Sequence, residues 1–136
     1  MLSCSRVPVT GRKQLKLVSE TELIQMSLVQ YNQFITENQV VNNTNEAQML
    51  DRVGNNIVNA ATDYLRKRQQ MDRIRGFDWD FDLVQDESVN AFAMPGGKVV
   101  FFSGIMPITR DEAGTAVVMS HEIAHVVARH GNERMS

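Results

Sequence analysis

Cysteine is almost absent from this chain of 136 residues, and long hydrophobic runs are missing. The single cysteine, Cys4, excludes an internal disulfide and any zinc site built from several thiolates. No stretch of about 18 apolar residues occurs, so no segment is expected to cross a bilayer as a helix. A complete signal peptide is also missing, because the chain shows neither its basic segment nor its apolar one.

A strong charge of either sign is missing as well. The chain contains 14 Lys and Arg residues and 16 Asp and Glu residues, which gives a formal net charge of −2. This balance argues against nucleic acid as the main partner, because phosphate binding needs a strongly cationic surface. The one basic run, Arg66-Lys67-Arg68 followed by Arg73 and Arg75, lies near the predicted end of a helix. Cations are favoured there by the helix dipole, which explains the run without a function.

The residues around Cys4 (LSCS) resemble the end of a bacterial lipoprotein signal, in which the cysteine becomes lipidated. The match is partial, because Met1 stands where leucine is usual and the upstream segment is missing. Cys4 is therefore a candidate lipidation site, with a free thiol on a flexible terminus as the alternative. Residues 1–18 are expected to form this flexible segment, since Pro8 and Gly11 interrupt any regular pattern.

Two amphipathic helices are predicted in the first half of the chain. Ser19 and Glu22 have the spacing of a capping box, which marks a helix start. The apolar residues that follow at helical spacing are Ile24, Leu28, Tyr31 and Ile35. This helix should fade in the Asn-rich segment 38–45. The stripe of the second helix is Leu50, Val53, Ile57, Ala61 and Tyr64, and this helix should end before Gly76.

A strand and a hairpin are predicted next. Over residues 77–82, aromatic residues alternate with three aspartates, which indicates a half-buried strand. The aspartates are interpreted as a solvated face, because a flat strand spreads its carboxylates instead of wrapping them around an ion. Residues 89–104 read as two strands joined at Pro95-Gly96-Gly97. Proline cannot donate to a ladder, so the first strand ends at Pro95 or lies at a sheet edge.

The last predicted helix begins at a second capping box, Thr109 with Glu112, and runs to about His130. Gly131 is well placed as its C-terminal stop. The helix is apolar almost all round, so it is expected to be buried.

This helix carries the sequence HEIAH, which suggests a metal site. His121 and His125 are four residues apart, so they lie one turn apart on the same face and can bind one zinc ion. Glu122 projects about 100° from His121, where it can act as general base on a water held by the metal. Two histidines and a glutamate inside a core are costly unless a metal satisfies them.

No third ligand for this metal is evident in the sequence. His130 points away from the pair by about half a turn, and Glu112 and Glu133 are too far along the helix. The simplest interpretation is that the chain is a piece of a longer protein.

Three segments together resemble a known family. NAFAMPGG (90–97), VVFFSGIMP (99–107) and DEAGTAVVMSHEIAHVVARHG (111–131) resemble the prenyl-protease/HtpX-like zinc metallopeptidases, in their BepA-, LoiP- and Oma-like branch. The resemblance implies an α+β fold, the N-terminal half of a gluzincin, with helices beside a small sheet and a hairpin before the metal-binding helix. It implies zinc bound by His121 and His125, with Glu122 as the base. Residues 19–136 would form a metallopeptidase domain, truncated before a glutamate ligand on a later helix.

The same resemblance implies a substrate-binding strand. Asn90, Ala91, Phe92 and Ala93 would border the cleft and pair with an extended peptide by strand addition. Simpler roles are favoured for some of these residues: core packing for Phe92 and turn geometry for Gly96 and Gly97.

The sequence therefore favours a zinc-dependent metalloendopeptidase that hydrolyses unfolded or extended polypeptides. The resemblance places it in the Gram-negative periplasm, lipid-anchored to the outer membrane, in quality control of envelope proteins. Contact with a membrane is expected only through the anchor. A catalytically silent binding or chaperone-like module is the alternative, and another metal-dependent hydrolase is a weaker one. The chain by itself is expected to be inactive, to bind zinc weakly and to self-associate through an uncovered apolar helix face.

Overall fold

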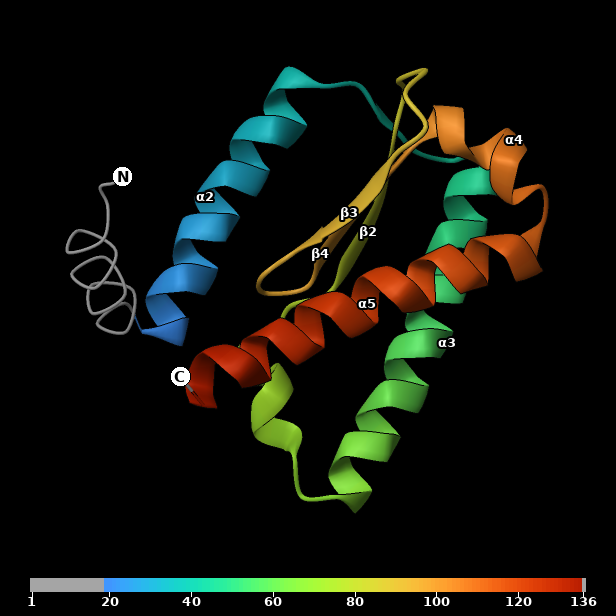
Figure 1. Ribbon diagram of the computed structural model, residues 1–136. Helices are drawn as coiled ribbons and strands as arrows, with labels where there is room; N and C mark the ends of the chain where they lie inside the picture. Colours follow the sequence, from blue (N-terminus) through green and yellow to red (C-terminus); the bar gives the residue numbers. More distant parts are fainter. Residues whose placement is uncertain (1–18, 136) are drawn as a thin grey trace, which may run out of the picture.

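The computed structural model describes residues 19–135, with side chains as far as Ala128, and confirms an α+β fold (Figure 1). Cys4 and the predicted flexible segment 1–18 lie outside the described residues. The elements are α2 (Glu20–Glu37), β1 (Val40–Val41), α3 (Asn45–Lys67), the 3₁₀ helix η1 (Met71–Ile74), β2 (Asp80–Val84), β3 (Ala91–Met94), β4 (Lys98–Phe102), the 3₁₀ helix η2 (Ser103–Ile105), α4 (Met106–Thr109) and α5 (Glu112–Met135).

The four strands form one mixed sheet in the order β1-β2-β4-β3. Strands β3 and β4 are the predicted hairpin, and β3 lies at the sheet edge. The turn between them requires Gly96 and Gly97, whose φ angles of 97° and 100° lie in the left-handed region. The amide of Gly97 closes the turn by donating to the carbonyl of Met94 at 3.0 Å.

The sheet lies between α2 on one face and α3 with α5 on the other (Figure 1). Alternation along β4 builds both layers, since successive side chains point to opposite faces. Val99 and Phe101 pack toward α3 and α5, whereas Val100 packs toward α2. All three side chains are fully buried. The sheet is therefore the central layer of the core and fixes where α5 lies.

The predicted start of the first helix and the predicted ends of the first two helices are confirmed. Ser19 caps α2, because its hydroxyl accepts the Glu22 amide at 3.0 Å while the Glu22 carboxylate accepts the Ser19 amide at 3.2 Å. Helix α2 ends at Glu37, next to the Asn-rich segment as expected. In α3, Arg66 and Lys67 occupy the last turn, the position that favours cations.

Two predictions about α5 are wrong. Thr109 does not cap it, because Thr109 ends α4 and donates its hydroxyl to the Met106 carbonyl at 3.1 Å. Asp111 takes that role, since its carboxylate accepts the Gly114 amide at 2.9 Å. Gly131 does not stop the helix, which continues to Met135. A glycine inside a helix costs only about 1 kcal/mol, so it ends a helix only where the chain turns.

Candidate metal centre

Helix α5 is held against the sheet by one buried stripe. Met119, Ile123 and Val126 on this stripe are almost fully buried. Met119 and Ile123 belong to the same apolar cluster as Leu50 and Val53 of α3. This stripe fixes the rotation of α5 about its own axis, and with it the direction of every other side chain on the helix.

The first turn of α5 is fixed by an ion pair and a close approach. Glu112 accepts two hydrogen bonds from Arg52 of α3, at 2.8 and 3.1 Å. This contact lowers the pKa of the Glu112 carboxyl through the Arg52 hydrogen bonds. A Cβ atom at Gly114 would lie 1.9 Å from the carbonyl oxygen of Thr109, so only glycine allows α4 and α5 to meet this closely. Glu112 thus pairs with Arg52 in the first turn of α5.

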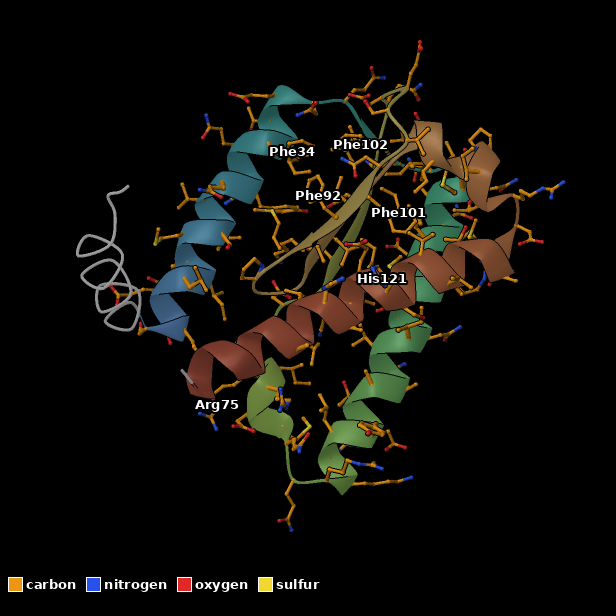
Figure 2. All side chains as sticks on the ribbon, in the orientation of Figure 1. Phe34, Arg75, Phe92, Phe101, Phe102 and His121 are labelled. Carbon is orange, nitrogen blue, oxygen red and sulfur yellow. The ribbon has the colours of Figure 1, made fainter. Side chains whose placement is uncertain are left out.

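His121 and His125 lie one turn apart on α5, and their ring centroids are 4.5 Å apart. Figure 2 labels His121 on this helix. The planes of the two rings are inclined by 87°. Both residues are exposed, on the side of the helix opposite the buried stripe. The arrangement leaves the imidazole nitrogens of both rings accessible for a shared ion.

The expectation that α5 is buried holds for one side of the helix only, and the expectation of an uncovered apolar face holds for the other. Val117 is 70% exposed, and Ala124 is exposed together with both histidines. The sheet and α3 cover only one side of α5, so the apolar residues on its other side meet solvent. The argument that a metal must satisfy histidines inside a core therefore does not hold for the described structure. The case for a metal rests instead on the geometry of the pair.

Glu122 differs from its two histidine neighbours in being partly buried. It projects about 100° around α5 from His121, between the exposed face and the core. Within the described part of the chain, no group of three or more His, Cys, Asp or Glu side chains could hold a metal ion. The described residues thus fit a zinc ion as two ligands with an adjacent carboxylate, and the third protein ligand that catalytic zinc takes is not among them.

Strand β3 presents a free edge beside α5. It hydrogen-bonds to β4 alone within the sheet and is in contact with α5. The Phe102 amide donates to the Asn90 carbonyl at 3.0 Å. Because bonded and non-bonded pairs alternate in an antiparallel ladder, Ala91 and Ala93 direct their backbone groups away from β4. The side-chain oxygen of Asn90 accepts a hydrogen bond from the Ala91 amide at 2.9 Å. The Ala91 carbonyl and the amide and carbonyl of Ala93 therefore face outward.

The side chain of Phe92 belongs to the core. Its ring lies 5.6 Å from that of Phe34 on α2 and 6.0 Å from that of Phe102, measured between centroids (Figure 2). Both contacts are edge-to-face, a favourable geometry for aromatic pairs. Of the predicted substrate-binding residues, Phe92 therefore offers no side chain to the edge, as its simpler interpretation proposed.

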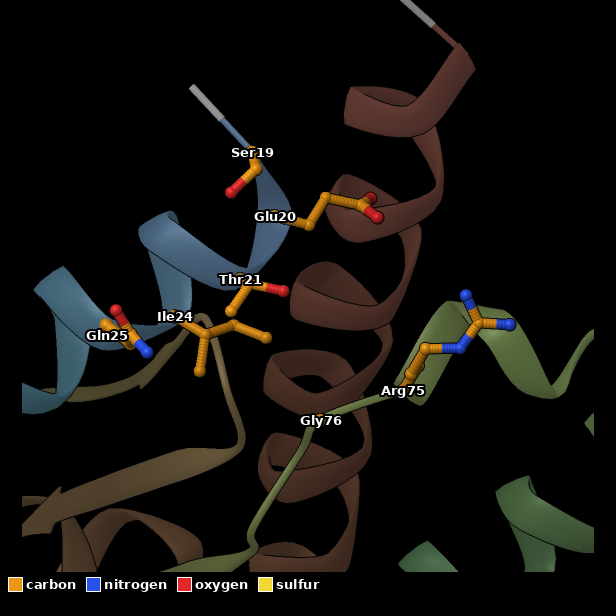
Figure 3. Close-up of a pocket in the computed structure, with 7 residues that line it drawn as sticks. All are labelled: Ser19, Glu20, Thr21, Ile24, Gln25, Arg75 and Gly76. Carbon is orange, nitrogen blue, oxygen red and sulfur yellow. The ribbon is translucent and has the colours of Figure 1, made fainter. Parts of the chain in front are cut away.

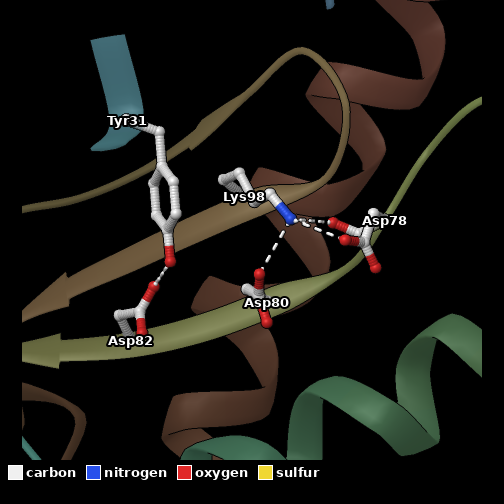
Figure 4. Close-up of polar contacts among 5 residues, drawn as sticks. All are labelled: Tyr31, Asp78, Asp80, Asp82 and Lys98. Atoms are coloured by element: carbon white, nitrogen blue, oxygen red, sulfur yellow. Dashed lines mark hydrogen bonds and ion pairs between the residues drawn. The ribbon is translucent and has the colours of Figure 1, made fainter. Parts of the chain in front are cut away.

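The interpretation of the aspartates in residues 78–82 as a solvated face is only partly right (Figure 4). Lys98 is 5% exposed, and its ammonium donates to the carboxylates of Asp80 at 2.8 Å and Asp78 at 3.3 Å. Tyr31 of α2 donates its hydroxyl to the partly buried Asp82. Helix α2 covers this face, which the alternation in the sequence could not indicate.

Burial dominates the pKa values in this cluster. It raises the pKa of Tyr31, and the hydrogen bond to Asp82 adds to the effect. Burial also raises the pKa of Asp82, while the Tyr31 hydrogen bond opposes it in part. For Lys98, burial lowers the pKa, but its contacts with Asp80 and Asp78 outweigh that effect and the pKa is raised. These contacts are therefore interpreted as structural: Tyr31 and Asp82 join α2 to the sheet, and Lys98 joins β4 to the start of β2.

A cavity of about 470 Å³ lies between the start of α2 and the end of η1 (Figure 3). Its lining residues are Ser19, Glu20, Thr21, Ile24, Gln25, Arg75 and Gly76. None of the predicted site residues lies there, so the cavity is separate from the histidine pair.

Comparison with known proteins gives one family and a consistent set of relatives. Residues 48–136 match the model of peptidase family M48. The mitochondrial metalloendopeptidase OMA1 of Schizosaccharomyces pombe is 47% identical over 58 residues, which is 43% of this chain and 17% of that protein. The mitochondrial metalloendopeptidase OMA1 of Bos taurus is 26% identical over 132 residues, or 95% of this chain and 24% of that protein.

A bacterial relative shows similar local identity. The beta-barrel assembly-enhancing protease of Escherichia coli K12 is 44% identical over 50 residues, which is 37% of this chain and 10% of that protein. The chain thus spans at most 24% of the length of these three relatives. In residues 19–135, no helix is long and apolar enough to cross a membrane.

Proposed function

The chain belongs to peptidase family M48, and from this premise we propose that it carries the zinc-binding helix and the catalytic base of a metalloendopeptidase. The observation that carries the proposal is the pair His121 and His125, exposed one turn apart on α5 with Glu122 beside them. The names of the relatives support the same activity, since they include two metalloendopeptidases and a protease.

The proposed zinc ligands are His121 and His125. Zinc takes imidazole nitrogens at about 2.0–2.1 Å, and two histidines four residues apart on a helix can share one ion. The third ligand is proposed to be a glutamate from outside the described residues. When bound, the zinc would acidify a water molecule and polarise the carbonyl of the substrate.

Glu122 is proposed to be the general base. Its carboxylate would accept a proton from the attacking water and pass it to the leaving amine. Partial burial would hold the side chain beside the metal site while leaving it within reach of water. The reaction would be peptide hydrolysis without a covalent bond between enzyme and substrate.

The substrate is proposed to be an unfolded or extended polypeptide that adds to the edge of β3. The Ala93 amide and carbonyl and the Ala91 carbonyl face outward there, so they can pair with an added strand. Because β3 and α5 are in contact, a peptide on this edge would lie beside the histidine helix. Asn90 would act through its side chain, which occupies the Ala91 amide and limits the length of the ladder.

The cellular setting is proposed from the relatives. The name beta-barrel assembly-enhancing protease favours a role in the bacterial envelope, with Cys4 as a lipid anchor in the periplasm. The OMA1 relatives are mitochondrial, so fractionation of cells that express the full-length protein would decide between the two compartments. Labelling with a lipid precursor, compared between the native protein and its Cys4→Ser variant, would test the anchor.

Replacing Glu122 with Gln in the full-length protein tests the proposed activity. Loss of the base should lower the cleavage rate of an unfolded polypeptide by about 10²- to 10⁴-fold. Zinc content should stay unchanged, because the ligands remain, whereas His121→Ala should lower both zinc content and cleavage. Equal cleavage by the native protein and its Glu122→Gln variant would refute the role of Glu122. No cleavage by either, with zinc bound, would favour the silent binding module.

A further inference from the structure

The basic residues of the described chain are concentrated around the turn between α3 and η1. Of the eight Lys and Arg residues in the range 19–128, five lie between Arg66 and Arg75. Segment 63–75 holds these five cations and two carboxylates. The remainder of residues 19–128 holds three cations and thirteen carboxylates. Within residues 19–128, the positive charge is therefore concentrated in one segment, which we call the basic tip (residues 63–75).

The α3 part of the basic tip projects from the rest of the fold, at the end of α3 that lies furthest from the sheet, whereas η1 packs against α5 (Figure 1). The side chains of Arg66 and Lys67 are 62% and 74% exposed. Both lie near Asp63, at 3.2 and 3.6 Å, but ion pairs this exposed contribute little and leave the cations available. The charge at this end of α3 is therefore presented to solvent.

Apolar side chains are interleaved with these cations. Tyr64 is 54% exposed and Met71 is 39% exposed. The guanidinium of Arg68 lies 3.7 Å from the centre of the Tyr64 ring. Amphipathic aromatic rings, flexible apolar chains and cations occur together on surfaces that lie in a membrane interface.

A mainly apolar groove of about 310 Å³ opens beside the tip, between α3 and α5. Tyr64, Leu65 and Arg73 line it on one side, and Ala124 and Ala128 of α5 line it on the other. The groove thus connects the basic tip to the stretch of α5 that carries His125.

We propose that the basic tip binds the anionic headgroups of a lipid membrane, with Tyr64 and Met71 entering the interface. Attraction to anionic lipids explains the segregated charge, and the exposed apolar side chains explain why the partner is a bilayer. An acidic peptide would need a groove lined by cations, whereas the groove beside the tip is mainly apolar and is lined by a single cation, Arg73. The proposal does not depend on zinc, on peptidase activity or on lipidation of Cys4.

Co-sedimentation with lipid vesicles tests this proposal. The chain, with Cys4→Ser to exclude lipidation, is mixed with vesicles of phosphatidylcholine alone or with about one third phosphatidylglycerol. Binding is expected only to the anionic vesicles, and it should weaken as salt is raised. A variant with Arg66, Lys67 and Arg68 replaced by Gln should lose about a hundredfold in partition, because each basic residue near the surface contributes roughly fivefold.

The matched control keeps the basic tip and changes the net charge equally. Gln25→Glu, Gln30→Glu and Gln39→Glu also lower the charge by three, at exposed positions of α2 and the segment after it. This control should retain most of the binding, and circular dichroism should show both variants folded. Equal loss in both variants, or equal binding to neutral vesicles, would overturn the proposal. Equally tight, tip-dependent binding to soluble polyglutamate would overturn it in favour of an acidic polypeptide.

Discussion

At the scale of single residues, one polar contact ties α2 to the sheet and a second ties β4 to the start of β2. The Tyr31 hydroxyl reaches Asp82, and the buried Lys98 bridges Asp78 and Asp80. A hydrogen bond to a charged group contributes about 1.5–3 kcal/mol when it is shielded from solvent. Asp82 nevertheless carries a cost, because burial raises its pKa and disfavours the charged form.

Replacing Asp82 with Asn should therefore change how stability depends on pH. The pKa of Asp82 in the folded chain is raised above its ordinary value of 3.8, so its stabilising contribution is present below that value and lost as pH rises through the folded pKa. Asn keeps an oxygen that accepts the Tyr31 hydroxyl but does not titrate. Relative to the native chain, Asp82→Asn should gain stability as pH rises from about 4 to about 7.

Urea unfolding across this range measures the difference between the two chains. The comparison cancels the contributions of other carboxylates, such as Asp86, whose pKa is lowered by hydrogen bonds from Ser88 and shifts stability the other way. A difference in unfolding free energy that does not change with pH would show that Asp82 is not held in a raised-pKa environment.

At the scale of elements, the pairing of β3 separates its structural role from its proposed substrate role. Phe92 faces β4 with its backbone, whereas Ala93 faces the open edge. Ala93→Pro should cost less than about 1 kcal/mol of stability, since proline is tolerated where the amide is unpaired at an edge. The full-length protein with Ala93→Pro should lose about tenfold in cleavage, because one substrate hydrogen bond is lost.

Phe92→Pro is the matched control for the edge experiment. It removes both an amide that the ladder uses and a ring packed against Phe34 and Phe102, so it should destabilise the hairpin far more than Ala93→Pro does. Cleavage by Ala93→Pro at the native rate, with the fold intact, would show that the peptide does not pair with this edge.

The elements that the sequence could predict are those set by neighbouring residues. The Ser19–Glu22 capping box and the two-glycine turn at residues 96–97 both need only local chemistry, and both are confirmed. The same reasoning was wrong at Thr109, because the short helix α4 ends there and Asp111 has the cap position. Whether Thr109 or Asp111 caps α5 depends on the path of the chain between them, which local sequence does not specify.

Features that depend on contacts far apart in the chain were not predictable. The parallel pairing of β2 with β4 places β3 at the edge, and no local pattern specifies it. The apolar sequence around the histidines indicated a buried helix, whereas only the Met119 side of α5 is covered. The roles of His121 and His125 were inferred from their spacing, which fixes the helix face that the two histidines share but not what covers that face.

At the scale of the whole molecule, the described fold leaves the histidine face of α5 uncovered. Val117 on this face is 70% exposed, and we expect the chain to self-associate through it. Light scattering should give a mass above the 15.4 kDa of one chain, and Val117→Glu should shift it toward the monomer. Val29→Glu is a control of matched exposure, 67%, on α2. A monomeric native chain at high concentration would contradict this expectation.

We propose that His121 and His125 share one zinc ion. Calorimetric titration of the chain with zinc is the direct test of this proposal. We expect one weak zinc site, because two protein ligands are fewer than the three that catalytic zinc takes. His121→Ala and His125→Ala should each abolish the site, whereas Glu122→Gln should retain it. No heat of zinc binding by the native chain, or binding that survives both histidine substitutions, would contradict the claim.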